Sequence, residues 1–163
     1  MAQKRDPSSP QNDESTIDVG DVDRRHRIYI PGKLTQNLSW WDKTSEVLAL
    51  LRFDEPGRIS LLSWNEHSPL VRAGRDSLLK SLPDHEAEDA LTILNARYHE
   101  LSGERSGRPT LPIVAMLHLF GSREFDSHVF VVRFLSRLEL WSIAYRNQKL
   151  LKGSPLLDDL DLP

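Results

Sequence analysis

The chain contains no cysteine among its 163 residues. Disulfide bonds and thiolate metal sites are therefore excluded, and the absence fits a reducing compartment such as the cytoplasm. No apolar run approaches the roughly 18 residues that a membrane helix needs. The N-terminal sequence MAQKRDPSSPQNDEST also lacks the apolar stretch of a secretory signal. We therefore expect a cytoplasmic protein without a membrane partner.

Sequence features of catalytic sites are absent as well. There is no glycine-rich phosphate loop, no nucleophile elbow and no Ser/His/Asp set, and no two of the six histidines have the i, i+4 spacing of a helical metal pair. We expect no enzymatic activity, no catalytic or metal-ligating residues, no cofactor and no small-molecule ligand. His118 lies in an apolar segment, and we expect it to be a core residue with a hydrogen-bonded ring.

Charge is close to balanced, with a formal net charge of -3. Residues 1–20 contribute -2 and residues 158–163 contribute -3, which leaves +2 for residues 21–157. A strong nucleic-acid binder is usually more basic than this. Residues 1–20 are polar and lack an apolar period, so they are predicted to be a disordered tail, and residues 152–163 to be an acidic tail.

What the sequence does contain is an internal repeat at an offset of 81 residues. The repeat needs no gap from Arg27 to Phe53, and the second copy then drops two residues in a turn. The matching pairs include Arg27 and Arg108, Pro31 and Pro112, Leu38 and Leu119, 51–53 and 132–134, and 58–61 and 137–140. Two copies of one small unit favour a pseudo-dimer within one chain.

The two copies predict the same order of short elements in an α+β fold. The first copy, 21–66, is expected to have a strand at 28–30, a helix at 33–38 and a hairpin of strands 47–53 and 59–63. The second, 103–151, is expected to have a strand ending at 110–112, a helix at 113–120 closed by Gly121, a hairpin of strands 129–134 and 138–142, and a C-terminal helix to Leu151.

Two linking helices are predicted between the copies, over 67–102. The first is expected to begin at a Ser68 cap and Pro69, and the second to run from Asp84 to Leu101. The residues expected to face inward are Leu70, Val71, Leu78, Leu79, Leu82, Ala87, Leu91, Leu94, Tyr98 and Leu101.

A short strand, a proline, a short helix and a buried hairpin resemble the unit of the AbrB-type swapped-hairpin fold. Two such units in one chain resemble the MraZ family of bacterial transcriptional regulators. That family carries an Asp-x-x-x-Arg motif before a strand and a proline, which residues 23–31 match. The second copy reads Glu104 to Pro112, and 138–141 resembles the family's acid-x-Trp segment. His26 replaces a usual glycine, Glu104 replaces Asp, and Pro109 removes a backbone donor.

The resemblance implies a regulator that binds double-stranded DNA, at repeated short boxes upstream of cell-division and cell-wall genes. It also implies a homo-oligomeric ring and a place at the nucleoid. The DNA-binding candidates are Asp23, Arg24, Arg25, Arg27, Lys33, Arg105 and Arg108. Guanidinium groups bind phosphates and guanine edges, and Asp23 is expected to hold Arg27 in one rotamer. A pseudo-twofold axis would put both arginine clusters on one face.

Structural explanations exist for four of these candidates and for other arginines and tryptophans of the chain. Asp23 and Arg27 also fit a structural ion pair, with Arg24 and Arg25 as solvated surface. Arg52 and Arg133 fall in buried strands and are expected to pair with acids or strand ends, and the tryptophans at 40, 41 and 141 are expected in the core or an interface. The alternative function is therefore a swapped-hairpin protein whose DNA face has decayed and which acts through oligomerisation or protein binding.

Overall fold

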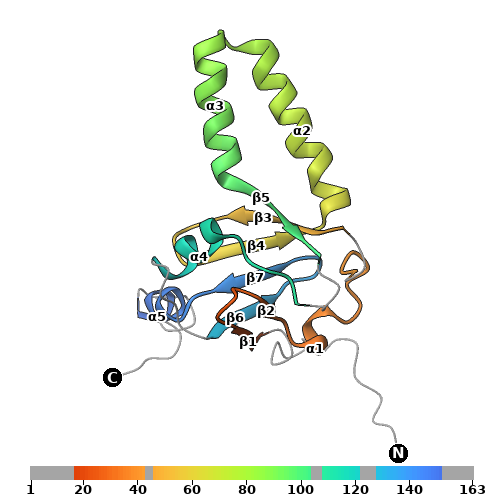
Figure 1. Cartoon of the computed structure of the whole chain (residues 1–163), viewed down its shortest axis with the longest axis vertical. Helices are drawn as coiled ribbons and strands as arrows, with labels where there is room; N and C mark the ends of the chain where they lie inside the picture. Colours follow the sequence, from red (N-terminus) through yellow and green to blue (C-terminus); the bar gives the residue numbers. More distant parts are fainter. Residues whose placement is uncertain (1–16, 43–45, 104–107, 122–127, 152–163) are drawn as a thin grey trace, which may run out of the picture.

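The structure is a computed structural model that describes residues 17–42, 46–103, 108–121 and 128–151. It confirms the α+β class (Figure 1). Within the described residues, five helices accompany one antiparallel sheet of seven strands, in the order β2-β1-β6-β7-β4-β3-β5. The elements in chain order are β1 (Ile17–Val22), β2 (Ile28–Tyr29), α1 (Gly32–Thr35), β3 (Val47–Phe53), β4 (Arg58–Leu62), α2 (Trp64–Ser81), α3 (Asp84–Arg97), β5 (Tyr98–Ser102), α4 (Ile113–Phe120), β6 (His128–Arg133), β7 (Leu138–Trp141) and α5 (Ile143–Leu151).

The two copies meet at the centre of the sheet, where β4 pairs with β7. Ser60 lies opposite Glu139, its counterpart in the repeat. Ile59 lies opposite Leu140, and the counterparts of these two residues, Leu138 and Leu61, lie opposite each other. The pairing is thus unchanged when the two copies are exchanged.

The outer strands show that the repeat is longer than the sequence predicted. β1 pairs with β6 of the second copy, and β5 pairs with β3 of the first copy. Ile17 of β1 lies opposite Val132 of β6, and Tyr98 of β5 lies opposite Arg52 of β3. Tyr98 is 81 residues after Ile17, and Val132 is 80 residues after Arg52, so the two pairs of strands have equivalent registers. Each copy therefore begins with a strand that joins the hairpin of the other copy.

This finding corrects two boundaries. Residues 17–20, predicted to belong to a disordered tail, lie in β1, and residues 1–16 and 152–163 lie outside the described residues. The second linking helix ends at Arg97, and residues 98–102 form β5 instead of continuing the helix. In β5, Leu101 is completely buried while His99 and Glu100 are exposed. A helical spacing and a short strand are hard to separate over five residues.

Equivalent residues after the first strands are buried in both copies. Pro31 and Pro112 directly precede α1 and α4, where a fixed proline φ suits the start of a helix. The pairs Leu34 and Ala115, and Leu38 and Leu119, all belong to one core cluster. α1 is shorter than predicted, whereas α4 matches its predicted bounds and ends at Gly121, whose φ of 74° favours glycine.

In the hairpins the offset changes earlier than the sequence alignment placed it. The turn of the first hairpin is closed by the N–H of Asp54 donating to Arg58, and that of the second by the N–H of Phe134 donating to Arg137. Position 54 thus corresponds to 134, an offset of 80, and only one residue is dropped in the turn. The predicted match of 51–53 with 132–134 is wrong by one residue.

The helices after the hairpins begin in the same way. Ser63 precedes α2 and its hydroxyl accepts from the N–H of Glu66 at 3.4 Å. Ser142 precedes α5 and its hydroxyl accepts from the N–H of Tyr145 at 3.0 Å. These caps place the start of α2 at Trp64, so the predicted start at Ser68 is wrong and Pro69 lies inside the helix.

Helices α2 and α3 project from the sheet as an arm (Figure 1). Their described side chains are largely exposed, and only Ser68 and Ala87 are buried. Leu70 and Leu79, predicted to face inward, are 68% and 51% exposed. The arm is therefore the least buried part of the described fold, and only its base contacts the sheet.

The arginines of β3 and β6, His118 and the tryptophans have partners within the protein. The guanidinium of Arg52 donates to Asp54 at 2.9 Å, and that of Arg133 donates to the carbonyl oxygens of Leu34 and Gln36. His118 hydrogen bonds to the carbonyl oxygens of residues 55 and 58. Trp40 and Trp41 pack against the core, and the indole of Trp141 donates to Glu139. The pairing predicted for Arg52 and Arg133 and the core packing predicted for Trp40 and Trp41 are confirmed, whereas His118, whose ring is hydrogen-bonded as predicted, and Trp141 are half-buried and lie outside the core cluster.

Glu139 is a fully buried carboxylate at the centre of this network. It accepts from Arg58 at 2.7 and 3.0 Å, from Arg137 at 3.0 Å and from Trp141 at 2.9 Å. Burial raises the pKa of Glu139, but the hydrogen bonds from Arg58 and Trp141 outweigh it and hold the pKa below its ordinary value. Arg58 and Arg137 are counterparts in the repeat, so one acid holds both copies together.

Candidate nucleic-acid interface

The turn between β1 and β2 is held by Asp23. Its Oδ1 accepts from the N–H of Arg25 and of Arg27, both at 2.9 Å, and its Oδ2 accepts from the guanidinium of Arg27 at 2.7 Å. Burial raises the pKa of Asp23, but the bonds from Arg27 and Arg25 outweigh it, so the pKa lies below its ordinary value. The expected restraint of Arg27 by Asp23 is present.

The same turn explains why glycine suits the position before the motif arginine. His26 has a φ of 63°, in the left-handed region that glycine adopts without steric cost. The turn closes through the N–H of His26 donating to Asp23 and the N–H of Asp23 donating to Arg27, both at 3.0 Å. His26 therefore adopts a left-handed backbone conformation that is less favourable for histidine than for glycine.

After the turn, the chain pairs with the matching segment of the second copy. Arg27 lies opposite Thr110 in an antiparallel bridge. The N–H of Ile28 donates to Pro109 at 2.9 Å, and the N–H of Leu111 donates to His26 at 2.8 Å. Because Ile28 and Pro109 are counterparts at the offset of 81, the register of this two-stranded ribbon is unchanged when the copies are exchanged, although Pro109 has no N–H to return the bond from Ile28.

Alternation along the ribbon separates a buried face from an open face. Ile28, Ile30 and Leu111 are buried in the core. Arg27, Tyr29, Arg108 and Thr110 lie on the other face, since residues that pair across antiparallel strands point to the same side. The Arg108 guanidinium lies 5.2 Å from the centre of the Tyr29 ring, within the range of a cation–π contact.

Strand geometry places the two motif arginines close together. Arg27 and Arg108 are two residues apart along the ribbon and on adjacent strands. With a rise of about 3.4 Å per residue and strands about 4.8 Å apart, their Cα atoms are separated by about 8 Å. Because β1 pairs with the other edge of β2, the two arginines lie on neighbouring segments of a larger pleated surface.

The remaining basic candidates differ in how available they are. Arg24 and Arg25 are exposed at the tip of the turn. Lys33 pairs with Asp18 of β1 at 3.2 Å. The pKa of Asp18 is lowered by the N–H of Val19 and by Lys33. Lys33 is thus engaged in an ion pair within the protein.

The structure brings together most of the predicted site. Asp23, Arg24, Arg25, Arg27 and Arg108 belong to the turn and the ribbon, while Lys33 lies beside β1 and Arg105 falls outside the described residues. Sequence reasoning missed Tyr29. Its position two residues after Arg27, in a predicted strand, was the available signal, because residues i and i+2 share a face.

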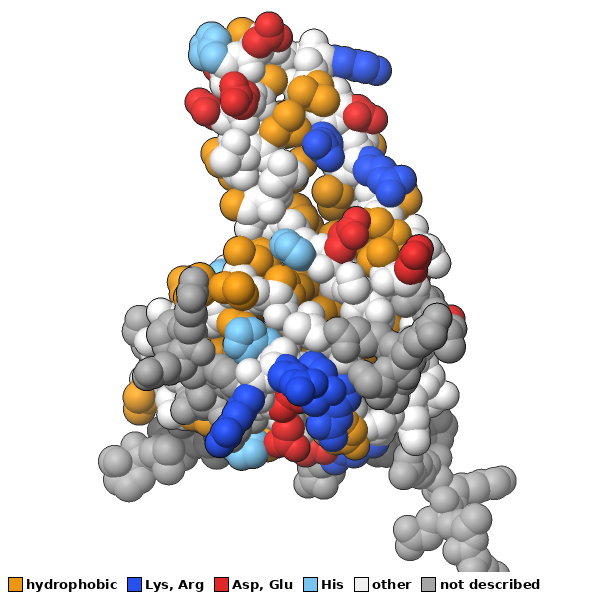
Figure 2. Space-filling model, viewed as in Figure 1, with side chains coloured by type: hydrophobic (Ala, Val, Ile, Leu, Met, Phe, Trp, Pro, Cys, Tyr) orange, Lys and Arg blue, Asp and Glu red, His pale blue; other side chains and the backbone are white. Residues whose placement is uncertain are grey.

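Acidic groups interrupt the basic surface. Asp21 pairs with His128 at 2.9 Å, with both side chains more than half exposed. Figure 2 shows basic and acidic side chains next to one another on the body below the arm. The surface is therefore a set of basic points and not a continuous positive face.

Helix α4 shows a second exposed surface beside this site. Ile113, Val114 and Leu117 are 51%, 49% and 43% exposed. Their counterparts in the first copy, at the offset of 81, are Gly32, Lys33 and Gln36. Only the second copy presents an apolar face at these positions.

Within the described ranges, no group of three or more histidine or acidic residues is placed to hold a metal ion. In the same part of the chain, no helix has both the length and the apolar character needed to cross a membrane. Comparison with models of known protein families gives no match, and neither does comparison with curated proteins. The functional argument therefore rests on the residues themselves.

Proposed function

We propose that the chain is a DNA-binding regulator of the MraZ type, acting in the cytoplasm at the nucleoid. In this proposal the two copies form a swapped-hairpin pseudo-dimer. The exchange of β1 and β5 between the two hairpins supports it, because each copy supplies a strand to the other. The binding element is the ribbon that contains Arg27, Tyr29 and Arg108, together with the turn that carries Arg24 and Arg25.

The observation that carries the proposal is the shared face of Arg27 and Arg108. Asp23 holds the guanidinium of Arg27 in place, which lowers the entropic cost of using it in recognition. Arg24 and Arg25 are exposed beside it and suit phosphate contacts. Arg27 and Arg108, on the ribbon, suit contacts with guanine edges.

Oligomerisation is part of the same proposal. One chain offers few basic contacts, and its surface includes Asp18 and Asp21. A single chain should therefore bind DNA weakly, whereas a ring of chains on repeated boxes should bind tightly through avidity. Cell-division and cell-wall promoters are the targets that the family resemblance suggests.

The test is fluorescence anisotropy with labelled DNA from upstream of the gene that encodes the chain. The variant Arg24→Ala/Arg25→Ala/Arg27→Ala is compared with the wild type across salt concentrations. The wild type should bind with affinity that falls steeply with salt, and the variant should show a slope reduced by about one for each phosphate that it no longer binds. Lys80→Ala, on the distant arm, is the control. Equal binding by wild type and triple variant would refute the proposal.

A second candidate is an assembly protein that does not use DNA. The exposed apolar face of α4 favours it, since isolated apolar residues are common on surfaces but a clustered helix face is typical of an interaction site. In this alternative the modest charge and the altered second motif, with Glu104 and Pro109, reflect a decayed DNA face. Concentration-dependent association in sedimentation, together with no DNA binding at low salt, would favour this candidate.

A further inference from the structure

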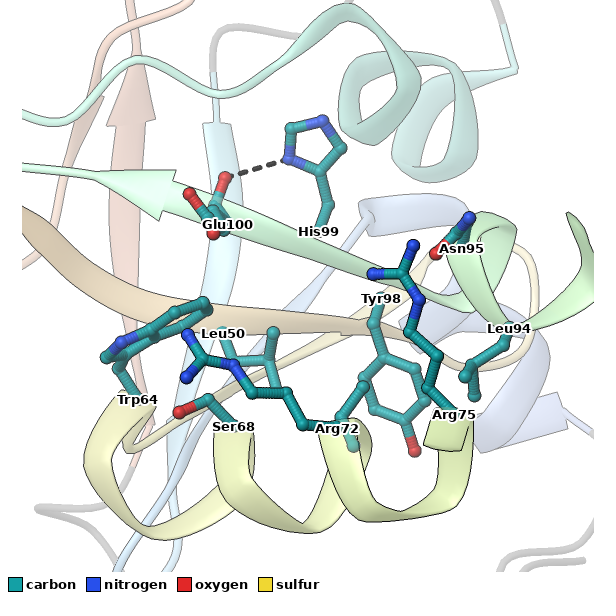
Figure 3. Close-up of a pocket in the computed structure, with 11 residues that line it drawn as sticks. Leu50, Trp64, Ser68, Arg72, Arg75, Leu94, Asn95, Tyr98, His99 and Glu100 are labelled. Carbon is teal, nitrogen blue, oxygen red and sulfur yellow. Dashed lines mark hydrogen bonds between the residues drawn. The ribbon is translucent and has the colours of Figure 1, made fainter. Parts of the chain in front are cut away.

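A cavity of about 270 Å³ lies where the arm joins the sheet (Figure 3). Its walls come from α2, α3 and the two strands β3 and β5. The aliphatic and aromatic part of the lining consists of Leu50, Trp64, Val71, Leu94 and Tyr98. The volume is slightly below the range of about 300–1,000 Å³ that is usual for small-molecule sites.

Two arginines of α2 border this cavity. The Arg72 guanidinium lies 6.0 Å from the centre of the Trp64 ring, at the limit of a cation–π contact. Arg75 has no ion-pair partner among the described residues. In Figure 3, Arg75 points toward Asn95 on one side of the cavity, and Glu100 and Trp64 lie on the other side. An anionic group is therefore favoured at the Arg75 side and disfavoured near Glu100.

The second copy shows how the equivalent surface is filled. At the offset of 80, Phe130 of β6 corresponds to Leu50 of β3. The Phe130 ring is covered by Arg146 of α5, whose guanidinium carbon is 4.4 Å from the ring centre. In the first copy a smaller leucine stands at that position, and an arm of two helices rises above it. The cavity thus lies over Leu50, whereas in the second copy Arg146 covers the equivalent Phe130.

We propose that this cavity binds a small amphipathic anion, with a branched aliphatic or aromatic body on Leu50 and Tyr98 and a carboxylate or sulfonate at Arg75 and Asn95. A guanidinium and an amide together offer several donors to such a group. The ligand contacts both helices of the arm and both strands beneath it. Binding therefore joins a sparsely buried arm to the sheet and restricts its motion.

The experiment uses the full chain and two fluorescent probes of similar shape. 8-Anilinonaphthalene-1-sulfonate is anionic, and N-phenyl-1-naphthylamine is its uncharged counterpart. The wild type should bind the anionic probe saturably at one site. Arg75→Gln should weaken that binding about tenfold, as expected for loss of a charge-assisted hydrogen bond, and change binding of the neutral probe by less than about twofold. Lys80→Gln, on the same helix but away from the cavity, should change neither.

A third variant tests the apolar part of the site. Leu50→Phe introduces the residue of the second copy and should reduce binding of both probes. Hydrogen exchange supplies an independent readout, since the anionic probe should slow exchange in 64–97 in the wild type and not in Arg75→Gln. Non-saturable binding, equal effects of Arg75→Gln and Lys80→Gln, or equal loss of both probes in Arg75→Gln would overturn the proposal.

Discussion

The first and second copies of the repeat share several features of their internal structure and differ on their surfaces. Both use a proline before a short helix, a buried leucine or alanine on that helix, and a serine cap after the hairpin. The surfaces diverge at Lys33 against Val114 and at Gln36 against Leu117, and the buried Leu50 stands against the half-buried Phe130. The comparison teaches that the residues common to both copies support the pairing of strands between the copies. The residues that differ give the molecule a basic face, an apolar face and a cavity at different places.

The largest expected difference between matched positions is at the centre of the sheet. Glu139→Gln keeps the size of the side chain but leaves Arg58 and Arg137 without their carboxylate. Breaking a buried ion pair on one side costs about 3–5 kcal/mol, so we expect the free energy of unfolding to fall by about 3 kcal/mol. Ser60→Ala, at the counterpart position, should cost about 1 kcal/mol because it removes hydrogen bonds to Asp54 and Arg52. Urea denaturation measures both.

The pH dependence of unfolding sharpens this prediction. The pKa of Glu139 is lowered from 4.5 in the folded state, so the unfolded chain takes up its proton first as pH falls. Its stabilising contribution is complete above about pH 4.5 and is lost as pH drops through the lowered folded value. Wild type should lose stability over this range more steeply than Glu139→Gln. Parallel curves, or a loss below about 1 kcal/mol at pH 7, would contradict the role of Glu139.

The two motif arginines provide the next comparison. Arg27→Ala should weaken DNA binding by about 1–3 kcal/mol and relax sequence preference, the expected effect of removing a base contact. Arg108→Ala should cost less, because Asp23 restrains Arg27 and the second motif departs from the family pattern at Glu104 and Pro109. Anisotropy with a promoter duplex and a scrambled duplex measures both effects. A larger loss for Arg108→Ala would reverse the assignment.

Exchanging the surface of α4 for that of α1 tests the apolar face. Val114→Lys with Leu117→Gln introduces the residues of the first copy at exposed positions, so the fold should be retained. If separate chains associate through α4, the association constant should fall at least about tenfold. A tenfold change corresponds to about 1.4 kcal/mol, which is less than the contribution of one buried aliphatic side chain. Sedimentation over a range of concentrations measures it. An unchanged association constant would remove α4 from the interface.

The smallest effect is expected at His26, which stands where the second copy has Gly107. His26→Gly should relieve the left-handed backbone strain but increase the entropy of the unfolded chain. We expect a net gain of about 0.5 kcal/mol in the free energy of unfolding, measured by urea denaturation. A loss of more than about 1 kcal/mol would show that the histidine side chain is required.

The sequence predicted the elements whose signals were local. Helix α4 has a proline before it, an apolar body and Gly121 after it, and its bounds are as predicted. The contact between Asp23 and Arg27 was also predicted, because an acid and an arginine four residues apart precede a strand. These features depend on neighbours in the chain, which sequence patterns report directly.

The sequence did not predict the features that depend on distant pairing. β1 consists of six residues of mixed polarity, and it forms a strand because it pairs with β6. The apolar residues of β5 continue the helical spacing of α3, but pairing with β3 makes this segment a strand. Tertiary context overrode local propensity in both cases. The start of α2 was missed because Ser63 and Ser68 are both suitable caps, and the hairpin before Ser63 decides between them.

The most direct test of the strand exchange is to express 17–66 and 98–151 separately and together. Neither fragment contains the hairpin strand that pairs with its own first strand, which is β6 for β1 and β3 for β5, or the partner of its own hairpin edge. We therefore predict that neither shows a cooperative melt as a monomer, and that mixing them restores a cooperatively folded pair, measured by circular dichroism and sedimentation. A fragment that sediments as a monomer and melts cooperatively would contradict the claim that the two copies complete one another.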